Sequence, residues 1–192
     1  MKQQTNLTDE LLVERLILGD CLAFNTLYNR YKDRLLYYFY RMLGNSKEKS
    51  QDFLQDIFMK LIDKAETFDR SRKFSTWIFS IAHNMCKNEY RRMMGRAYSE
   101  IETLSEVLLE EEEQEFDIDN SNLEQFIVDL FNELETFDEI HKSAFLLRYR
   151  EGFSMKDIGQ TLEISEGTVK SRLFYTRQRL AERLAHYQFL QH

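Results

Sequence analysis

The segment from Glu151 to Leu180, EGFSMKDIGQTLEISEGTVKSRLFYTRQRL, has the pattern of two short amphipathic helices around a tight turn. Ser154 is placed to cap the first helix, and Asp157 stands three residues later to complete a capping box. Gly159 permits close approach of a crossing helix, and Ser165 is placed to cap the second helix. These signals constrain the fold of this segment to a pair of packed helices.

The second helix of this pair separates into two faces when its residues are placed at about 100° intervals. The apolar face, expected to be buried, holds Val169, Leu173, Thr176 and Leu180. The opposite face holds Ser171, Phe174, Tyr175 and Gln178, flanked by Lys170 and Arg177 on one side and Arg172 and Arg179 on the other. Short polar and aromatic groups suit base edges, and cations suit phosphates. The pattern therefore predicts a helix-turn-helix that binds DNA; the alternative is a surface helix whose arginines only contact solvent.

The rest of the chain also favours helices. None of the 192 residues is proline and only six are glycine, and no strand-length alternating segment is bounded by turn residues. A chain of this length holds one large or two small domains. We expect an all-α protein of two small helical domains joined by an acidic linker.

The net charge of −7 argues against DNA binding until its distribution is considered. Residues 100–139 carry 16 acidic groups and no lysine or arginine. Residues 1–99 carry 17 basic and 12 acidic groups, and residues 140–192 carry 9 basic and 5 acidic groups. Two mildly basic modules therefore flank a strongly acidic segment. That segment is interpreted as a solvated spacer, a mimic of nucleic acid that follows a basic channel, or a shield for the basic modules.

Helical periodicity predicts the domain limits. Four helices are expected from Thr8 or Asp9 to Leu18, from near Asp20 to Met42 or Leu43, from Lys47 to Ala65 and from Ser75 to Met94. They make residues 1–95 an N-terminal four-helix bundle. Residues 96–122 are expected to be the flexible acidic linker, and residues 123–192 the C-terminal helix-turn-helix domain.

The helix expected from Ser75 carries a second nucleic-acid signal. One side of it presents Trp77, Ser80, Asn84, Lys87, Asn88 and Arg91. An indole, amides and cations on one stripe suit stacking, hydrogen bonding and phosphate neutralisation on a single strand. Taken alone, a tryptophan at the position of Trp77 is more often a core residue near a helix start. His83 is expected to be a polar contact or a satisfied surface group.

The order of these motifs resembles the extracytoplasmic-function (ECF) group of bacterial RNA polymerase sigma factors. Four segments that together span nearly the whole chain carry the resemblance: GDCLAFNTLYNRY (Gly19–Tyr31), SQDFLQDIF (Ser50–Phe58), FSTWIFSIAHNMCKNEYRR (Phe74–Arg92) and FLLRYREGFSMKDIGQTLEISEGTVKSRL (Phe145–Leu173). Each motif is moderately specific, and their order and spacing make the combination highly specific.

The resemblance implies partners and residue roles. It implies that Asp52, Gln55 and Asp56 contact the polymerase β′ clamp. The helical wheel independently exposes the two aspartates, although a solvated acidic face explains them too. Residues assigned to the −10 element are Trp77, Asn84, Lys87, Asn88, Arg91 and Arg92. In the −35-reading helix, base edges are assigned to Lys170, Ser171 and Phe174, and phosphates to Thr168, Arg172 and Arg177, with Tyr175 and Gln178 on the reading face. An inhibitory anti-sigma protein is a further implied partner.

Some positions depart from the family pattern. Asn88 replaces a usual Asp, Asp138 replaces a common Pro, and Gly159 replaces a usual Ala, which lowers helix propensity by up to about 1 kcal/mol. Tyr175-Thr176 replaces a common Arg-Ala pair, so the promoter sequence cannot be transferred from relatives.

Other functional classes find little support in the sequence. We expect no catalytic residues, cofactor or metal, because the chain has no phosphate-cradling glycine loop and its four histidines are scattered. Neither an apolar run of membrane-spanning length nor a signal peptide is apparent, so a cytoplasmic protein without membrane insertion, monomeric when free, is expected. Cys21 and Cys86 are expected to fill helix-packing positions.

Two rival functions remain open at this stage. A conventional regulator would bind duplex operators without polymerase, usually as a dimer. A helical adaptor that binds only proteins would tolerate charge reversal at Lys170 and Arg172, whereas a sigma factor would lose promoter selection.

Overall fold

The computed structural model describes residues 7–100 and 121–187, with side chains described for residues 7–94 and 123–187. In these two ranges the chain forms α-helices and one 3₁₀ turn, without a strand. The expectation of an all-α fold is confirmed.

The N-terminal domain begins with three helices whose starts follow their capping residues. They are α1 (Asp9–Ile17), α2 (Cys21–Met42) and α3 (Lys47–Lys64). Thr8, Asp20 and Ser46 each accept a hydrogen bond from a backbone N–H in the first turn of the helix that follows. After the 3₁₀ turn η1 (Ala65–Thr67), the chain enters the long helix α4 (Phe74–Glu100).

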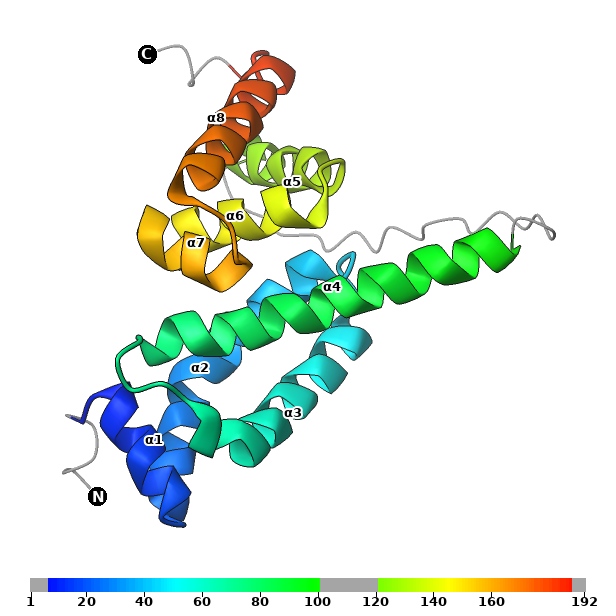
Figure 1. Cartoon of the computed structure of the whole chain (residues 1–192). Helices are drawn as coiled ribbons and strands as arrows, with labels where there is room; N and C mark the ends of the chain where they lie inside the picture. Colours follow the sequence, from blue (N-terminus) through cyan, green and yellow to red (C-terminus); the bar gives the residue numbers. More distant parts are fainter. Residues whose placement is uncertain (1–6, 101–120, 188–192) are drawn as a thin grey trace.

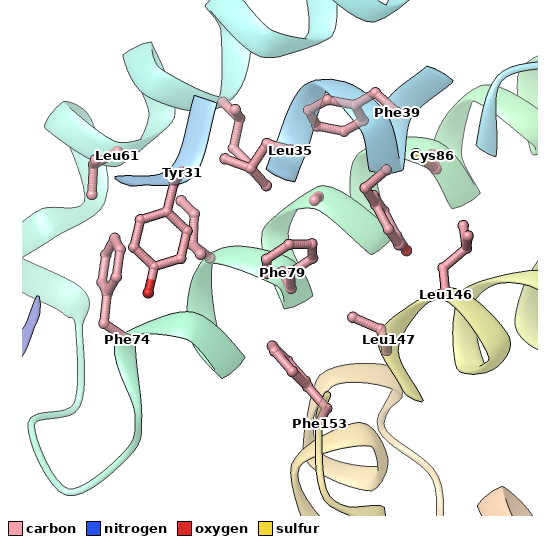
Figure 2. Packing of buried hydrophobic residues seen from close by; sticks show 14 of the residues in the cluster. Tyr31, Leu35, Phe39, Leu61, Phe74, Phe79, Cys86, Leu146, Leu147 and Phe153 are labelled. Carbon is pink, nitrogen blue, oxygen red and sulfur yellow. The ribbon is translucent and has the colours of Figure 1, made fainter. Parts of the chain in front are cut away.

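The core of this domain is an aromatic and aliphatic stack between α2, α3 and α4 (Figure 2). Its fully buried members include Tyr31, Leu35, Phe39, Leu61, Phe74 and Phe79. Each such side chain contributes about 1.5–3 kcal/mol by leaving water. Edge-to-face contacts order the stack, with 5.1 Å between the ring centroids of Tyr31 and Phe74 and 5.4 Å between those of Tyr38 and Phe79.

The C-terminal domain consists of α5 (Ser121–Glu135), α6 (Glu139–Tyr149), α7 (Met155–Leu162) and α8 (Glu166–Arg183). The predicted capping box of Ser154 and Asp157 is present at the start of α7. Glu163 adopts a left-handed conformation with φ of 57° and ends that helix. Asp138 caps α6 by accepting from the N–H groups of Ile140 and His141.

Gly159 is where α7 passes closest to the turn into α8. A Cβ at this position would lie 2.8 Å from the backbone oxygen of Ile164, a distance that real Cβ atoms do not show. The expected close approach is confirmed. It also explains why glycine stands at this position although alanine is the better helix former.

The two domains pack directly on each other. Figure 1 shows the C-terminal helices lying over α4, with α7 against its N-terminal half. One continuous apolar cluster joins the domains, and Leu146, Leu147 and Phe153 from the C-terminal domain meet the N-terminal core (Figure 2).

Several sequence-based expectations need correction or limits. α4 runs six residues past the expected end at Met94, so residues 96–100 of the expected linker are helical, as are residues 121 and 122 in α5. Residues 101–120, most of the acidic segment, lie outside the described residues. Cys86 is buried as expected, but Cys21 is exposed, because it stands at the solvent-facing start of α2.

Candidate nucleic-acid interface

Helix α8 presents the reading face that its periodicity predicted. Val169, Leu173, Thr176 and Leu180 are buried against the domain core. Lys170, Ser171, Phe174, Tyr175, Arg177 and Gln178 are exposed. The rings of Phe174 and Tyr175 each leave 62% of their surface in solvent and lie edge to face with centroids 5.6 Å apart. Two large exposed aromatic side chains among cations and amides are typical of a binding surface.

Three other polar residues of α8 are held within the domain. Thr168 is half-buried and pairs with the capping hydroxyl of Ser165 at 2.8 Å. The Nη1 atom of Arg172 lies 3.2 Å from Nδ1 of His141 and 3.7 Å from Oδ2 of Asp138. Arg179 donates to Glu133 of α5 at 3.1 Å. These contacts fix α8 on α5 and α6, whereas Lys170 and Arg177 are exposed on one edge of the helix.

The stripe predicted on α4 is partly available to a ligand. Asn88, Arg91 and Arg92 are exposed, and Asn84 and Lys87 are half-buried. Arg92 donates to Glu89 at 2.8 Å, while among the described residues Lys87 and Arg91 form no ion pair. The stripe thus keeps two cations and two amides along one edge of the helix.

Trp77 combines the two interpretations that its sequence position allowed. Its indole is half-buried and packs on the core, with ring centroids 5.2 Å from Phe68 and 5.8 Å from Phe74. The remaining surface faces solvent at the start of the α4 stripe. Packing therefore fixes the indole, and its open edge can still contact a base.

Helix α3 exposes the acidic surface that the wheel predicted. Asp52, Gln55 and Asp56 are all exposed, while Ile57, Phe58 and Leu61 bury the opposite side. Both aspartates lie outside the domain core and make no ion pair among the described residues.

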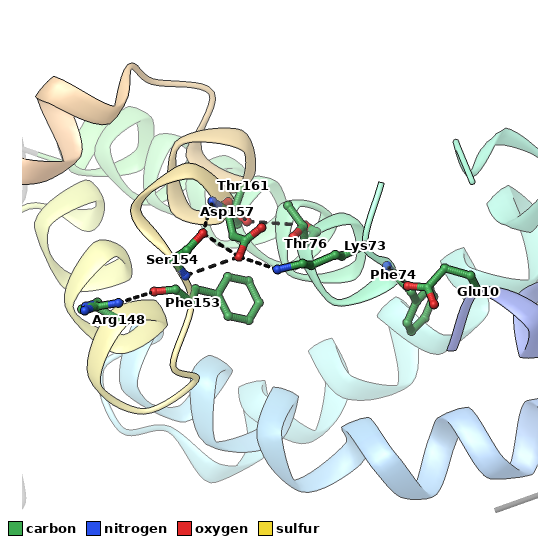
Figure 3. A network of polar contacts seen from close by, with 9 residues as sticks. All are labelled: Glu10, Lys73, Phe74, Thr76, Arg148, Phe153, Ser154, Asp157 and Thr161. Atoms are coloured by element: carbon green, nitrogen blue, oxygen red, sulfur yellow. Dashed lines mark hydrogen bonds and ion pairs between the residues drawn. The ribbon is translucent and has the colours of Figure 1, made fainter. Parts of the chain in front are cut away.

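The contacts between the domains involve residues for which the sequence predicted no interdomain role. Arg34 of α2 binds Glu151, with Nη2 and Oε2 at 2.6 Å. Lys73, just before α4, binds Asp157 of α7 with Nζ and Oδ2 at 2.8 Å (Figure 3). Partial burial opposes ionisation of Asp157, but its bonds with Lys73 and Ser154 hold the pKa of its carboxyl below the usual value.

Aromatic and hydroxyl groups also meet across the interface between the domains. The rings of Phe79 and Phe153 meet edge to face with centroids 5.5 Å apart. The Tyr38 and Ser143 hydroxyl oxygens lie 2.6 Å apart in a buried contact. The hydroxyl of Thr161 donates to the backbone oxygen of Thr76 at 3.5 Å (Figure 3).

His83 is buried, and the expectation of a surface or satisfied histidine is wrong. Its exposed fraction is 3%, and its Nδ1 finds no hydrogen-bond partner in the part of the chain that the structure describes. Burial, with a smaller effect of Lys87, lowers the pKa of His83 to about 4. Thr76, two helical turns earlier on the same face of α4, likewise has a buried Oγ1 without a partner among the described residues.

Neither a metal-binding cluster nor a membrane-spanning helix is present in the described residues. Within residues 7–100 and 121–187, no three His, Cys, Asp or Glu side chains gather to hold a metal ion. None of the described helices is both long and apolar enough to cross a membrane.

Comparison with known sequence families places both domains. Residues 27–95 match the Sigma-70 region 2 family, and residues 132–180 match the Sigma-70 region 4 family. The chain is 32% identical over 189 residues to the ECF RNA polymerase sigma-E factor of Haemophilus influenzae, which covers 93% of this chain and 96% of that protein. It is 30% identical to the ECF RNA polymerase sigma factor SigW of Bacillus subtilis over 86% of this chain and 91% of SigW.

Solved structures share the fold. The sigma factor RpoE in complex with the anti-sigma factor NepR from Bartonella quintana aligns with a TM-score of 0.68 and 22% identity, covering 84% of this chain and 96% of RpoE. CnrH in complex with the cytosolic domain of CnrY aligns with a TM-score of 0.67 and 22% identity, covering 93% of this chain and 97% of CnrH.

Proposed function

The chain belongs to the ECF group of RNA polymerase sigma factors, and we propose that its two domains divide promoter recognition between α8 and α4. As a sigma factor it binds core RNA polymerase and directs promoter-specific transcription initiation, and it is not an enzyme. The residue roles below are part of the proposal.

Recognition of the −35 element is assigned to α8. The observation that carries this assignment is the separation of its faces: the predicted apolar residues are buried, and Lys170, Ser171, Phe174, Tyr175, Arg177 and Gln178 are exposed together. Lys170 and Ser171 stand in the N-terminal half of α8, where a recognition helix contacts base edges. Thr168 and Arg172 keep their proposed phosphate contacts, but their present bonds within the domain make positioning of α8 part of their role.

Capture of the unpaired −10 strand is assigned to Trp77, Asn84, Lys87, Asn88, Arg91 and Arg92. The exposed cations run along one edge of α4, as a backbone-tracking surface requires, and the fixed indole offers a stacking edge. Asn88 supplies a neutral amide at the position for which the family resemblance implies Asp, so this proposed strand-binding surface carries one negative charge fewer than that pattern would give.

Binding to the polymerase β′ clamp is assigned to Asp52, Gln55 and Asp56. Support comes from their joint exposure on α3, opposite the buried face that fixes this helix in the bundle. An anti-sigma protein is a further proposed partner, as the neighbours RpoE and CnrH are in complex with NepR and CnrY. A cytoplasmic location follows from the polymerase partner. Residues 1–95 and 123–192 are the proposed functional domains.

The packed arrangement of the two domains does not fit simultaneous binding of both promoter elements. Elements centred near −10 and −35 lie about 25 base pairs apart, which is about 85 Å of duplex at about 3.4 Å per pair. A compact chain of this length has a radius of gyration of only about 16 Å. The domains must therefore separate when both elements are bound.

Transcription in vitro with core polymerase and a promoter library tests the proposal. The wild-type chain should select a −35 and −10 pair, and Lys170→Ala should change the −35 preference while leaving the −10 preference intact. Arg183→Ala, which removes the same charge from the last turn of α8, is the matched control. Absence of initiation from every sequence would overturn the proposed function, and an unchanged −35 preference would overturn the role of Lys170.

A further inference from the structure

The face of α4 that the C-terminal domain covers has the composition of a nucleic-acid surface. It holds Phe79, which meets Phe153, and Thr76, which meets Thr161, and Arg34 and Lys73 lie beside it. The buried imidazole of His83 follows two helical turns after Thr76 on the same side of α4. The Arg34 guanidinium lies 5.6 Å from the centre of the Phe79 ring. Cations next to an aromatic ring and hydrogen-bonding groups are the elements that bind a single strand.

Some polar atoms of this face make no hydrogen bond when the domains are packed together. Thr76 and His83 are at least 97% buried, yet Oγ1 of the first and Nδ1 of the second have no hydrogen-bond partner among the described residues. A buried polar atom without a partner costs about 1–3 kcal/mol. Such atoms on one helix face indicate that the face has another binding state in which they are satisfied.

The segment that covers this face, residues 151–157, carries acidic groups and an aromatic ring that complement it. Glu151, Phe153 and Asp157 lie within seven residues, and each meets a complementary group: Arg34, Phe79 and Lys73. The two carboxylates pair with the two cations as phosphates would, and the pair of Asp157 with Lys73 is drawn in Figure 3. The Phe153 ring lies against Phe79, where a base would stack or pack (Figure 2). The side chain of Glu151 is only 4% exposed, so its carboxylate interacts with Arg34 and has little contact with solvent.

We propose that residues 151–157 act as an internal substitute for single-stranded DNA, occupying a strand-binding surface formed by Arg34, Lys73, Thr76, Phe79 and His83. This inference rests on the proposed function, because it extends the −10 surface of α4 around the helix to a face that becomes available when the domains separate. The unpaired promoter strand and residues 151–157 then compete for the same groups. Release of the C-terminal domain and capture of the strand are coupled.

The first test measures binding of a fluorescent single-stranded oligonucleotide to the full chain by anisotropy at fixed salt. Glu151→Lys places a cation against Arg34 and should expose the surface, raising affinity at least fivefold over wild type. Glu66→Lys, at an exposed position of η1, makes the same charge change and is the matched control. In the double variant with Glu151→Lys, Arg34→Gln should remove most of the gain in oligonucleotide affinity. In the double variant with Glu66→Lys, Arg34→Gln should change oligonucleotide affinity less than twofold.

A second measurement follows the separation of the domains in the same proteins. Cys21 is exposed and Cys86 is buried, so one dye on Cys21 and another on Ala181→Cys of α8 report the distance between the domains. The oligonucleotide should lower energy transfer in the otherwise wild-type chain, and duplex of the same length should not. The inference would be overturned if the domains separate in the Glu151→Lys variant and this variant still binds the oligonucleotide with the same affinity as the Glu66→Lys variant.

A third outcome identifies a different partner. If the Glu151→Lys variant gains affinity for core polymerase but not for the oligonucleotide, the covered face binds protein and the inference is wrong. Transcription by the wild-type chain is scored separately, so that loss of the proposed function and loss of this inference remain distinguishable.

Discussion

Gly159 shows how one missing side chain sets the geometry of the C-terminal domain. Its hydrogen replaces a Cβ that would lie 2.8 Å from the Ile164 oxygen. Gly159→Ala should therefore destabilise the protein by about 1–3 kcal/mol, although alanine favours an isolated helix by up to about 1 kcal/mol. Urea unfolding of the two proteins measures the difference. A more stable alanine variant would mean that the turn relaxes without cost.

His83 makes stability depend on pH. Its pKa is about 4 in the folded chain, below the ordinary value of about 6.5 that applies when the chain is unfolded. The unfolded state therefore binds more protons between these values, and the free energy of unfolding falls as pH drops from about 6.5 to about 4. The loss attributable to His83 is about 3 kcal/mol.

The measurement compares urea unfolding of the wild-type chain and His83→Gln from pH 7.5 to pH 4. The variant lacks the titrating group, so the difference in stability between the two proteins should narrow or reverse in acid. A difference that stays constant with pH would contradict burial of a neutral imidazole.

At the scale of the helix, local sequence determined most of what was observed. Caps at Ser154 and Ser165 predicted helix starts because each satisfies backbone N–H groups locally. The buried and exposed faces of α8 followed from periodicity alone. The covered face of α4 did not, because Phe79 and Thr76 of this face contact Phe153 and Thr161, which belong to the other domain. No local pattern records such a contact, and His83 was therefore misplaced.

The exposed acidic face of helix α3 leads to a prediction about polymerase binding. Replacing both Asp52 and Asp56 with lysine should lower affinity for core polymerase at least tenfold, because like charges then face the proposed clamp contact. Stability should change by less than about 0.5 kcal/mol, as expected for exposed positions. Sedimentation with core polymerase measures the first and urea unfolding the second. Binding equal to that of the Glu66→Lys control would exclude this surface from the contact.

At the scale of the whole molecule, the charge of the chain is arranged so that cations of one domain are neutralised by acids of the other. Arg34 and Lys73 are paired with Glu151 and Asp157 across the interface, while Lys170 and Arg177 of α8 remain exposed. The packed chain therefore offers duplex DNA the proposed −35 surface of α8, while the strand-binding surface proposed around Arg34 and Lys73 is covered. Recognition of a whole promoter then depends on an agent that holds the domains apart, and we propose that core polymerase, which a sigma factor binds, is this agent.

This arrangement predicts how the free chain discriminates between DNA molecules. The affinity of the free chain for a duplex with both promoter elements should differ by less than about twofold from its affinity for a duplex with the −35 element alone. The reason is that a packed chain with a radius of gyration of about 16 Å cannot reach both elements at once. With core polymerase present, the second element should add at least tenfold. Titrations at one fixed salt concentration are required, since phosphate contacts make affinity strongly salt-dependent. If the free chain already prefers the two-element duplex tenfold, its domains separate without polymerase and the packed arrangement does not limit promoter binding.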